Sequence, residues 1–196
     1  MMMKTRKPEI ILFLILICPA LLICSCRNNT MPRPRGHFRI DLPEKEYTEF
    51  DSICPFTFEY PVYSEIRKEP GMDEYCWFNI VFPDYKGKLH LSYMDVNNNL
   101  RALTDDAHKL AYKHSVKADA IEEKLWINDD ENVYGIIYLI SGDAASSVQF
   151  FVTDSLSHYL RGSLYFDAQP NKDSLAPVIN FFRQDVVHLI ETLEWK

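Results

Sequence analysis

The sequence predicts an α+β domain, in which an antiparallel β-sheet is covered by packed amphipathic helices. Short runs of strand-forming residues follow one another between turn residues, which is typical of consecutive hairpins. Two longer segments, residues 100–114 and 173–193, carry apolar residues at helical spacing. Aromatic residues make up 13% of the chain, which favours an ordered core and argues against disorder.

Three strands are predicted in the first half of the domain. Phe56–Tyr60 and Tyr75–Phe82 are rich in β-formers, and a proline follows each of them. Residues 88–93 come after a turn and alternate polar with apolar side chains, so the second and third strands predict a hairpin with one buried face. His90 falls on the polar face of this hairpin and is predicted to face solvent.

Four further strands are predicted in the second half, as a meander of antiparallel neighbours. They cover residues 121–127, 133–141, 145–154 and 158–167. Residues 133–141 are the most apolar, which predicts a central position in the sheet. The C-terminal helix is predicted to be capped by Asp173 or Ser174, with Pro177 in its first turn, where proline is tolerated. Its broad apolar stripe must cover a sheet.

The helix predicted over residues 100–114 follows Asn97–Asn99, which supply a turn and an N-cap. A long helix, a meander and a C-terminal helix in this order are similar to the PsbP/Mog1-like fold. This is an analogy at the level of the fold, and folds of this kind say little about function.

The N-terminus has the pattern of a bacterial lipoprotein signal peptide. Basic residues precede an apolar run that is too short to span a bilayer comfortably, which takes about 20 residues. Ser25 and Cys26 then fit the lipobox, in which a small residue precedes the cysteine that is acylated. Cys18 and Cys24 fit less well, because each follows an isoleucine. We therefore predict a signal peptide over residues 1–25 and lipidation at Cys26; the alternative is an uncut membrane anchor.

Residues 26–37 are predicted to form a tether between the lipid and a single domain over residues 38–196. The tether lacks apolar periodicity and is rich in proline and arginine. Its arginines could also contact anionic lipid headgroups. Acidic residues do not follow Cys26, and such residues mark surface export in gliding-type bacteria. We therefore expect a domain that faces the periplasm.

The charge of the chain argues against a nucleic-acid partner. The formal net charge is −7, and the body of the chain has no basic cluster. An exported protein would also not meet nucleic acid in its normal compartment.

Cys54 and Cys76 are the two cysteines that remain once the signal peptide and the lipidated cysteine are set aside. An even pair in an oxidising compartment predicts a disulfide, worth roughly 3 kcal/mol on the chain-entropy model. The alternative is two buried free thiols, because the sequence does not show how closely their Cα atoms approach. The mature chain has no Cys-x-x-Cys pair, which argues against a redox catalyst.

No pattern in the chain carries a reaction with any specificity. There is no Gly-x-Ser-x-Gly, His-Glu-x-x-His, phosphate-binding loop or dinucleotide fingerprint. Ser146 and Ser147 follow a turn and could be exposed, but a serine nucleophile needs a base held against it. The candidate bases would be His90, His114 and His158. Asp105 and His108 lie three residues apart on a helix, a spacing far more typical of a solvated face than of a metal site.

The densest polar cluster lies at the end of the first helix. It comprises Tyr112, Lys113, His114, Lys117 and Asp119, and one interpretation is a patch that recognises a partner or ligand. The plainer interpretation is a helix C-terminus, where lysine and histidine are electrostatically favoured.

Several blocks between about Pro32 and the C-terminus carry a family resemblance. They are Cys54–Pro61, Cys76–Ile80, Tyr85–Tyr93, Tyr112–His114, Lys117–Ile121, Thr153–Ser155, Leu160–Phe166 and Glu194–Lys196. Through these blocks, which cover nearly the whole mature chain, the sequence resembles the gliding motility lipoprotein GldD family.

The resemblance implies an envelope lipoprotein needed by the gliding apparatus and by the type IX secretion machinery associated with it. It implies a non-enzymatic role in the assembly or stability of other components, with protein partners and without metal or cofactor. Many non-gliding relatives keep these genes, so secretion is the safer process to expect. Two other classes stay open. A small-ligand-binding lipoprotein needs a pocket between sheet and helices, and a periplasmic hydrolase needs a nucleophile and a histidine within hydrogen-bond reach.

Overall fold

The computed structural model describes three stretches of the chain, residues 40–68, 74–167 and 172–196. The chain divides into two compact units after Gly36, and all described residues belong to the second unit. The predicted signal peptide over residues 1–25, the lipidation site Cys26 and the tether over residues 26–37 therefore lie outside the described residues.

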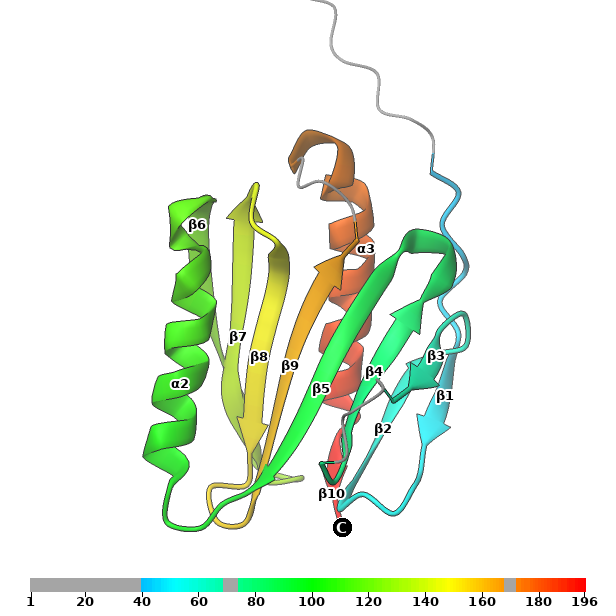
Figure 1. The fold of residues 1–196 in the computed structure, drawn as a ribbon. Helices are drawn as coiled ribbons and strands as arrows, with labels where there is room; N and C mark the ends of the chain where they lie inside the picture. The colour runs from blue at the N-terminus through cyan, green and yellow to red at the C-terminus, as the bar shows by residue number, and fades with distance from the viewer. Residues whose placement is uncertain (1–39, 69–73, 168–171) are drawn as a thin grey trace, which may run out of the picture. The chain divides into compact units, whose positions relative to one another are not determined.

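The described residues form a large antiparallel sheet (Figure 1). Its strands are β3 (Glu65–Arg67), β4 (Trp77–Phe82), β5 (Gly87–Asp95), β6 (Ala118–Asn128), β7 (Val133–Gly142), β8 (Ser146–Thr153) and β9 (His158–Phe166). They lie in the order β3-β4-β5-β9-β8-β7-β6, and each neighbouring pair is antiparallel. The β5–β9 pair joins the first-half strands to the second-half meander.

A smaller sheet and two helices complete the described part of the domain. The small sheet has the order β1-β2-β10, from β1 (Tyr47–Phe50), β2 (Phe56–Pro61) and β10 (Glu194–Trp195). The helices are α2 (Leu100–Tyr112) and α3 (Lys172–Glu191), with 3-10 turns η1 (Pro83–Tyr85) and η2 (Lys113–Val116). The predicted α+β class, with an antiparallel sheet and packed helices, is confirmed.

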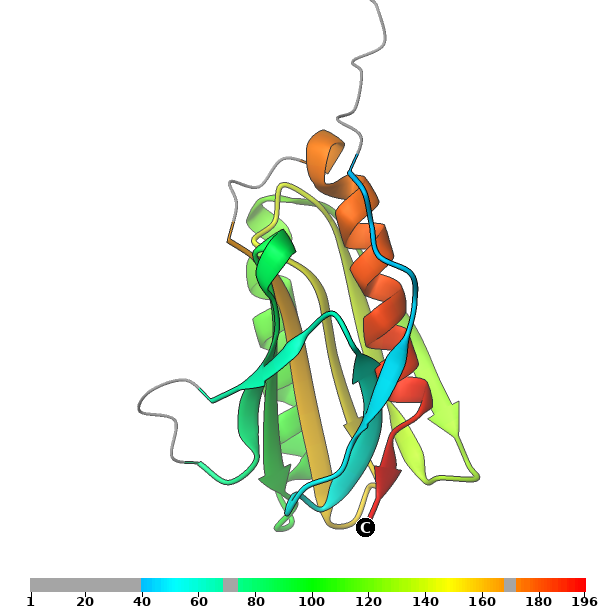
Figure 2. The same cartoon turned by 90° about the vertical axis from the view of Figure 1, so that its right-hand side faces the viewer.

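One face of the large sheet, here called the inner face, is closed by α3 and the small sheet (Figure 2). Alternate residues of β4, β5, β7, β8 and β9 point into this layer and pack against α3 and β2 in one continuous apolar core. Gly162 allows close packing there, since a Cβ at this position would lie 2.1 Å from Cε1 of Phe150. The stripe on the C-terminal helix therefore does cover a sheet, as its sequence pattern predicts.

The opposite face, here called the outer face, carries α2 on its β6–β7–β8 side. Ala107 and Ala111 of α2 pack on Tyr138, Phe151 and Tyr159 in a second, smaller cluster. Figure 1 shows α2 beside these strands and no helix of the described residues over β5 and β4. The outer residues of β5 are accordingly all partly exposed.

A disulfide joins Cys54 to Cys76, with their Cα atoms 5.7 Å apart. In the structure these two cysteines are therefore bonded to each other and are not two free thiols. It ties the start of β2 to the start of β4, and both cysteines are buried in the inner core.

Two predictions about individual elements are wrong. β7 is not central in the sheet but lies next to the edge strand β6. Its residues are apolar because both of its faces are covered, one by the inner core and the other by α2. Helix α3 begins by Lys172, so Pro177 lies inside the helix and not in its first turn. The predicted N-cap position is confirmed at Asn99, although its side chain accepts a hydrogen bond from the backbone N–H of Asn97 and makes none to the helix.

Candidate functional site

The predicted patch at the end of α2 is spread over two parts of the outer face. The hydroxyl of Tyr112 donates to Oε1 of Glu123 at 2.8 Å, toward the β6 edge. His114 points the other way, and its ring lies 6.4 Å from that of Tyr165 on β9. Lys113 and Lys117 are exposed. Asp119 is exposed as well, at the start of β6. His114 is thus the member of the patch that leads toward the middle of the sheet.

A row of polar side chains crosses the outer face from edge to edge. Directly opposed residues of antiparallel strands lie on the same face, so the strand register fixes this row. In strand order, the polar row consists of Arg67, Asn79, His90, Ser163, Gln149, Tyr138 and Glu123. Each strand of the large sheet contributes one residue to it. His90 is therefore a half-buried member of a polar row, and not the fully solvent-facing residue that the sequence predicts.

Three members of the polar row are buried and carry side-chain atoms that have no hydrogen-bond partner among the described residues. Asn79 is 1% exposed, Gln149 2% and Ser163 3%. Within the described part of the chain, neither amide atom of Asn79 has a partner, and neither does Nε2 of Gln149 or Oγ of Ser163. Nearly all buried polar groups in proteins are hydrogen-bonded, and leaving one unpaired costs about 1–3 kcal/mol. A partner outside the described residues, a buried water or another molecule, would remove this cost.

Arg161 lies on β9 beside the polar row, on the same face and two residues from Ser163. Its Nη2 donates to Oε1 of Gln149 at 3.0 Å. None of the ion pairs among the described residues involves Arg161. Burial and, next, the charge of Arg161 lower the pKa of His114. A half-buried guanidinium without a counter-ion is well suited to bind a carboxylate or phosphate group.

A groove of about 610 Å³ opens at the far end of the polar row and shares Arg67 and His90 with it. Lys86 and Lys88 also line this groove, and Asp167 is the one carboxylate among its described lining residues. Arg67 is paired with a neighbouring glutamate on its own strand. Together with Arg161, the groove gives the open half of the outer face a positive character within an acidic chain.

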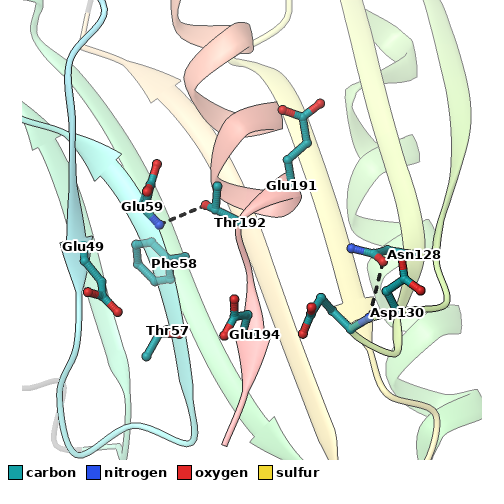
Figure 3. Close-up of a pocket in the computed structure, with 10 residues that line it drawn as sticks. Glu49, Thr57, Phe58, Glu59, Asn128, Asp130, Glu191, Thr192 and Glu194 are labelled. Carbon is teal, nitrogen blue, oxygen red and sulfur yellow. Dashed lines mark hydrogen bonds between the residues drawn. The ribbon is translucent and has the colours of Figure 1, made fainter.

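A second hollow, the acidic cleft, has the opposite charge (Figure 3). It has a volume of about 400 Å³ between β2, the end of α3 and the β6–β7 turn. Its carboxylates are Glu49, Glu59, Asp130, Glu131, Glu191 and Glu194. The backbone N–H of Glu59 donates to Oγ1 of Thr192 at 2.9 Å, and the Glu59 carboxylate lies 2.7 Å from Nε2 of His188. Over the described residues, no group of three or more His, Cys, Asp or Glu side chains is placed to hold a metal ion.

The serines considered as nucleophiles are buried. Ser146 is fully buried, and its hydroxyl donates to the carbonyl of Leu164 at 3.0 Å. Ser147 is 5% exposed, and its Oγ has no hydrogen-bond partner among the described residues. His158 is engaged elsewhere, with its Nδ1 2.8 Å from the hydroxyl of Tyr93. The arrangement that acyl transfer needs, a serine held by a histidine, is therefore not formed by these side chains.

A buried cluster fixes the first described segment of the domain to α3. Asp185 is 3% exposed and accepts hydrogen bonds from Lys45 at 2.5 Å, from Tyr47 at 3.0 Å and from Tyr63 at 2.8 Å. Burial lowers the pKa of Lys45, although Asp185 opposes this shift. Burial and the bond to Asp185 raise the pKa of Tyr63. These four residues form a satisfied polar cluster, in contrast to the polar row.

Comparison with known families gives a match over almost the whole chain. The family described as gliding motility lipoprotein GldD matches residues 27–195. The chain belongs to this family. As a member of a lipoprotein family it is a membrane-anchored protein of the cell envelope. Neither helix of the described residues is long and apolar enough to cross a membrane.

Comparison with other proteins adds less. No curated protein matches the chain at the significance threshold. A similar solved structure is the solution structure of cyanobacterial PsbP (CyanoP) from Synechocystis sp. PCC 6803, which is 10% identical. The match covers 81% of this chain and 98% of that chain, with a TM-score of 0.49. The order of the predicted elements suggested this fold, but a likeness of this degree carries no functional argument.

The sequence does not predict the polar row as a site, although it offers His90 as a candidate base. It does not predict Arg161 as a site residue either. Polar residues at alternate positions of a strand ordinarily face solvent, so their burial becomes visible only in three dimensions. One weak signal exists. Asn79 interrupts the apolar run of β4, where an unpaired polar side chain is unexpected.

Proposed function

We propose that this GldD-family lipoprotein supports the assembly or stability of the gliding motility and type IX secretion machinery and is not an enzyme. Membership of the family over residues 27–195 is the observation that carries this proposal. The proposal includes a signal peptide over residues 1–25, a lipid on Cys26 and a domain that faces the periplasm. In this arrangement the lipid and the tether hold the α+β domain beside its membrane-bound protein partners.

The architecture of the domain supports a docking role. Its inner face is filled by the core, whereas the outer face keeps an open half that other molecules can reach. Ser146 and Ser147 lack a histidine partner among the described residues, so the periplasmic hydrolase has no support at those positions.

Deletion of the gene in the source bacterium, with complementation, tests the proposal. We expect secretion of type IX cargo to fall to background in the deletion strain and to return with the wild-type gene. Cys26→Ala should restore secretion poorly, because the domain loses its anchor, while the neighbouring Cys24→Ala serves as the matched control and should restore it. Normal cargo secretion in the deletion strain would contradict the proposal.

A small-ligand-binding lipoprotein is the second candidate. The groove of about 610 Å³ beside the unpaired polar atoms of Asn79 favours it. The competition experiment described below separates this candidate from a protein-docking role.

A further inference from the structure

The open half of the outer face combines three features that point to a bound ligand. The first is charge, because Arg161 is half buried and takes part in none of the ion pairs among the described residues. In a chain with a formal net charge of −7, a cation of this kind would be neutralised easily by a nearby carboxylate of the same chain. Its isolation leaves the guanidinium available to an acceptor on another molecule.

The second feature is the set of unpaired polar atoms next to Arg161. Asn79 offers both an N–H donor and a carbonyl acceptor, Gln149 offers an N–H donor and Ser163 a hydroxyl, and all three side chains are at least nine-tenths buried. They lie in one row, on the same face as Arg161. A ligand with a carboxylate and with peptide-like donors and acceptors would satisfy both the charge and the amides.

The third feature is the shape of the open surface. The outer residues of β5, from Lys88 to Met94, are all partly exposed along a strand of nine residues. At about 3.4 Å per residue, the seven residues from Lys88 to Met94 span roughly 24 Å. The exposed strip continues at one end into the groove lined by Lys86 and Lys88. An extended peptide segment matches a surface of this length better than a compact ligand does.

We propose that the open half of the outer face binds an extended acidic segment of a partner protein, with Arg161 pairing to a carboxylate and the polar row bonding to the peptide. The inference deepens the proposed function and rests on it for the role of the partner. The amides of Asn79 and Gln149 are buried below the surface of the sheet, where a planar membrane surface cannot contact them, whereas an inserted peptide side chain can. The negative charge of the rest of the chain also disfavours an extended polyanion such as nucleic acid.

The test uses the full-length lipoprotein in detergent micelles and a fluorescein-labelled octapeptide of alternating glutamate and serine. We expect saturable binding that weakens with salt, and no binding of the matched lysine–serine peptide. Arg161→Gln should weaken binding about tenfold or more, because it removes a charge-assisted hydrogen bond. Arg101→Gln is the matched control, since Arg101 is a fully exposed arginine at the start of α2, and it should change the dissociation constant less than twofold.

Competition experiments and stability measurements complete the test. Competition with glutarate and with phosphatidylglycerol vesicles should displace the peptide weakly, and equal or stronger displacement by either would overturn the assignment to a protein segment. Equal losses for Arg161→Gln and Arg101→Gln, or no binding of the acidic peptide at all, would overturn the site. An unchanged urea midpoint for Arg161→Gln shows that its loss is not unfolding, and Asn79→Leu gives a second variant that leaves the charge in place.

Complementation separates this inference from the proposed function. If Arg161→Gln restores secretion in the deletion strain as well as the wild-type gene does, the site has no docking role, while the requirement for the protein itself stands. We expect Arg161→Gln to restore secretion only in part.

Discussion

The two faces of the large sheet are built from the same strands yet follow different rules. On the inner face, alternate residues are apolar, fully buried and packed against α3 and β2. On the outer face, one residue of each strand belongs to the polar row, and three members of this row carry buried atoms without a described partner. Because side chains alternate along each strand, the same strands form both surfaces, and the residues of one face can change without changing those of the other.

Buried polar groups sharpen the comparison. Asp185, on the side of the inner face, accepts hydrogen bonds from three donors, Lys45, Tyr47 and Tyr63. Asn79, on the outer face, is buried to the same extent and has no described partner for either amide atom. Buried polar groups are nearly always hydrogen-bonded, and the partner segment proposed above would supply the bonds that Asn79 lacks among the described residues.

The largest effect is expected where the inner face is packed most densely. Phe182 of α3 is fully buried, and its ring centroid lies 4.4 Å from that of Phe82 and 5.2 Å from that of Tyr85. Phe182→Ala should lower the free energy of unfolding by about 3–5 kcal/mol, because it removes apolar contacts and leaves a cavity. Urea denaturation followed by tryptophan fluorescence measures the change.

The matched truncation on the outer side is Leu125→Ala. Leu125 is 71% exposed on β6. Its loss should change the free energy of unfolding by no more than about 0.5 kcal/mol. A cost for Leu125→Ala that approaches the cost for Phe182→Ala would show that the exposed edge strand β6 contributes to stability as much as the inner core does, and the two faces would not differ in this respect.

A smaller loss is expected from Asp185→Asn. The substitution keeps the shape of the side chain but removes the charge that neutralises Lys45, which is 26% exposed. We expect a loss of about 2–3 kcal/mol, less than for a fully buried ion pair because Lys45 is partly hydrated. Asp105→Asn, on the exposed surface of α2, is the control and should be nearly neutral.

The pH dependence of this variant has a definite sign. Burial already lowers the pKa of Lys45 in the wild type, and without Asp185 the pKa falls further. The folded variant therefore favours neutral Lys45, so its deficit is largest below the folded pKa and narrows as pH rises toward the ordinary pKa of lysine. A deficit that stays constant or widens with rising pH would show that Lys45 does not respond to Asp185.

Much of the inner face follows from the sequence, and much of the outer face does not. The alternation of Leu89, Leu91 and Tyr93 and the stripe along α3 predict the core correctly, because apolar periodicity reports burial directly. The same logic fails for β7, whose apolar character comes from cover on two faces and not from a central place in the sheet. Apolarity measures burial, whereas strand order depends on pairing between distant segments.

The candidate site illustrates the second limit. The sequence predicts a patch from Tyr112 to Asp119, since those residues are adjacent in the chain. The structure instead aligns Asn79, Ser163 and Gln149 from three strands that are linked through His90, and the pairing of His90 with Ser163 joins residues 73 positions apart (163 − 90). No local pattern marks such a row, because each of its residues looks like an ordinary outward-facing strand residue.

The smallest effect on stability, and the most direct test of the comparison, is expected from Asn79→Leu. Leucine has the same number and branching of side-chain heavy atoms as asparagine, although it is larger, and it removes two buried polar atoms that have no described partner. The variant should be as stable as the wild type or up to about 1 kcal/mol more stable, because the desolvation cost of the amide disappears. Secretion in the complemented deletion strain should nevertheless fall, as in other cases where a binding site is kept at a cost to stability.

Asn97→Leu, an exposed position before α2, controls for the substitution itself and should leave both readouts unchanged. If Asn79→Leu lowered the free energy of unfolding by more than about 1 kcal/mol, the polar row would stabilise the fold. Both faces of the sheet would then contribute to stability, and the outer face would not be set apart for binding.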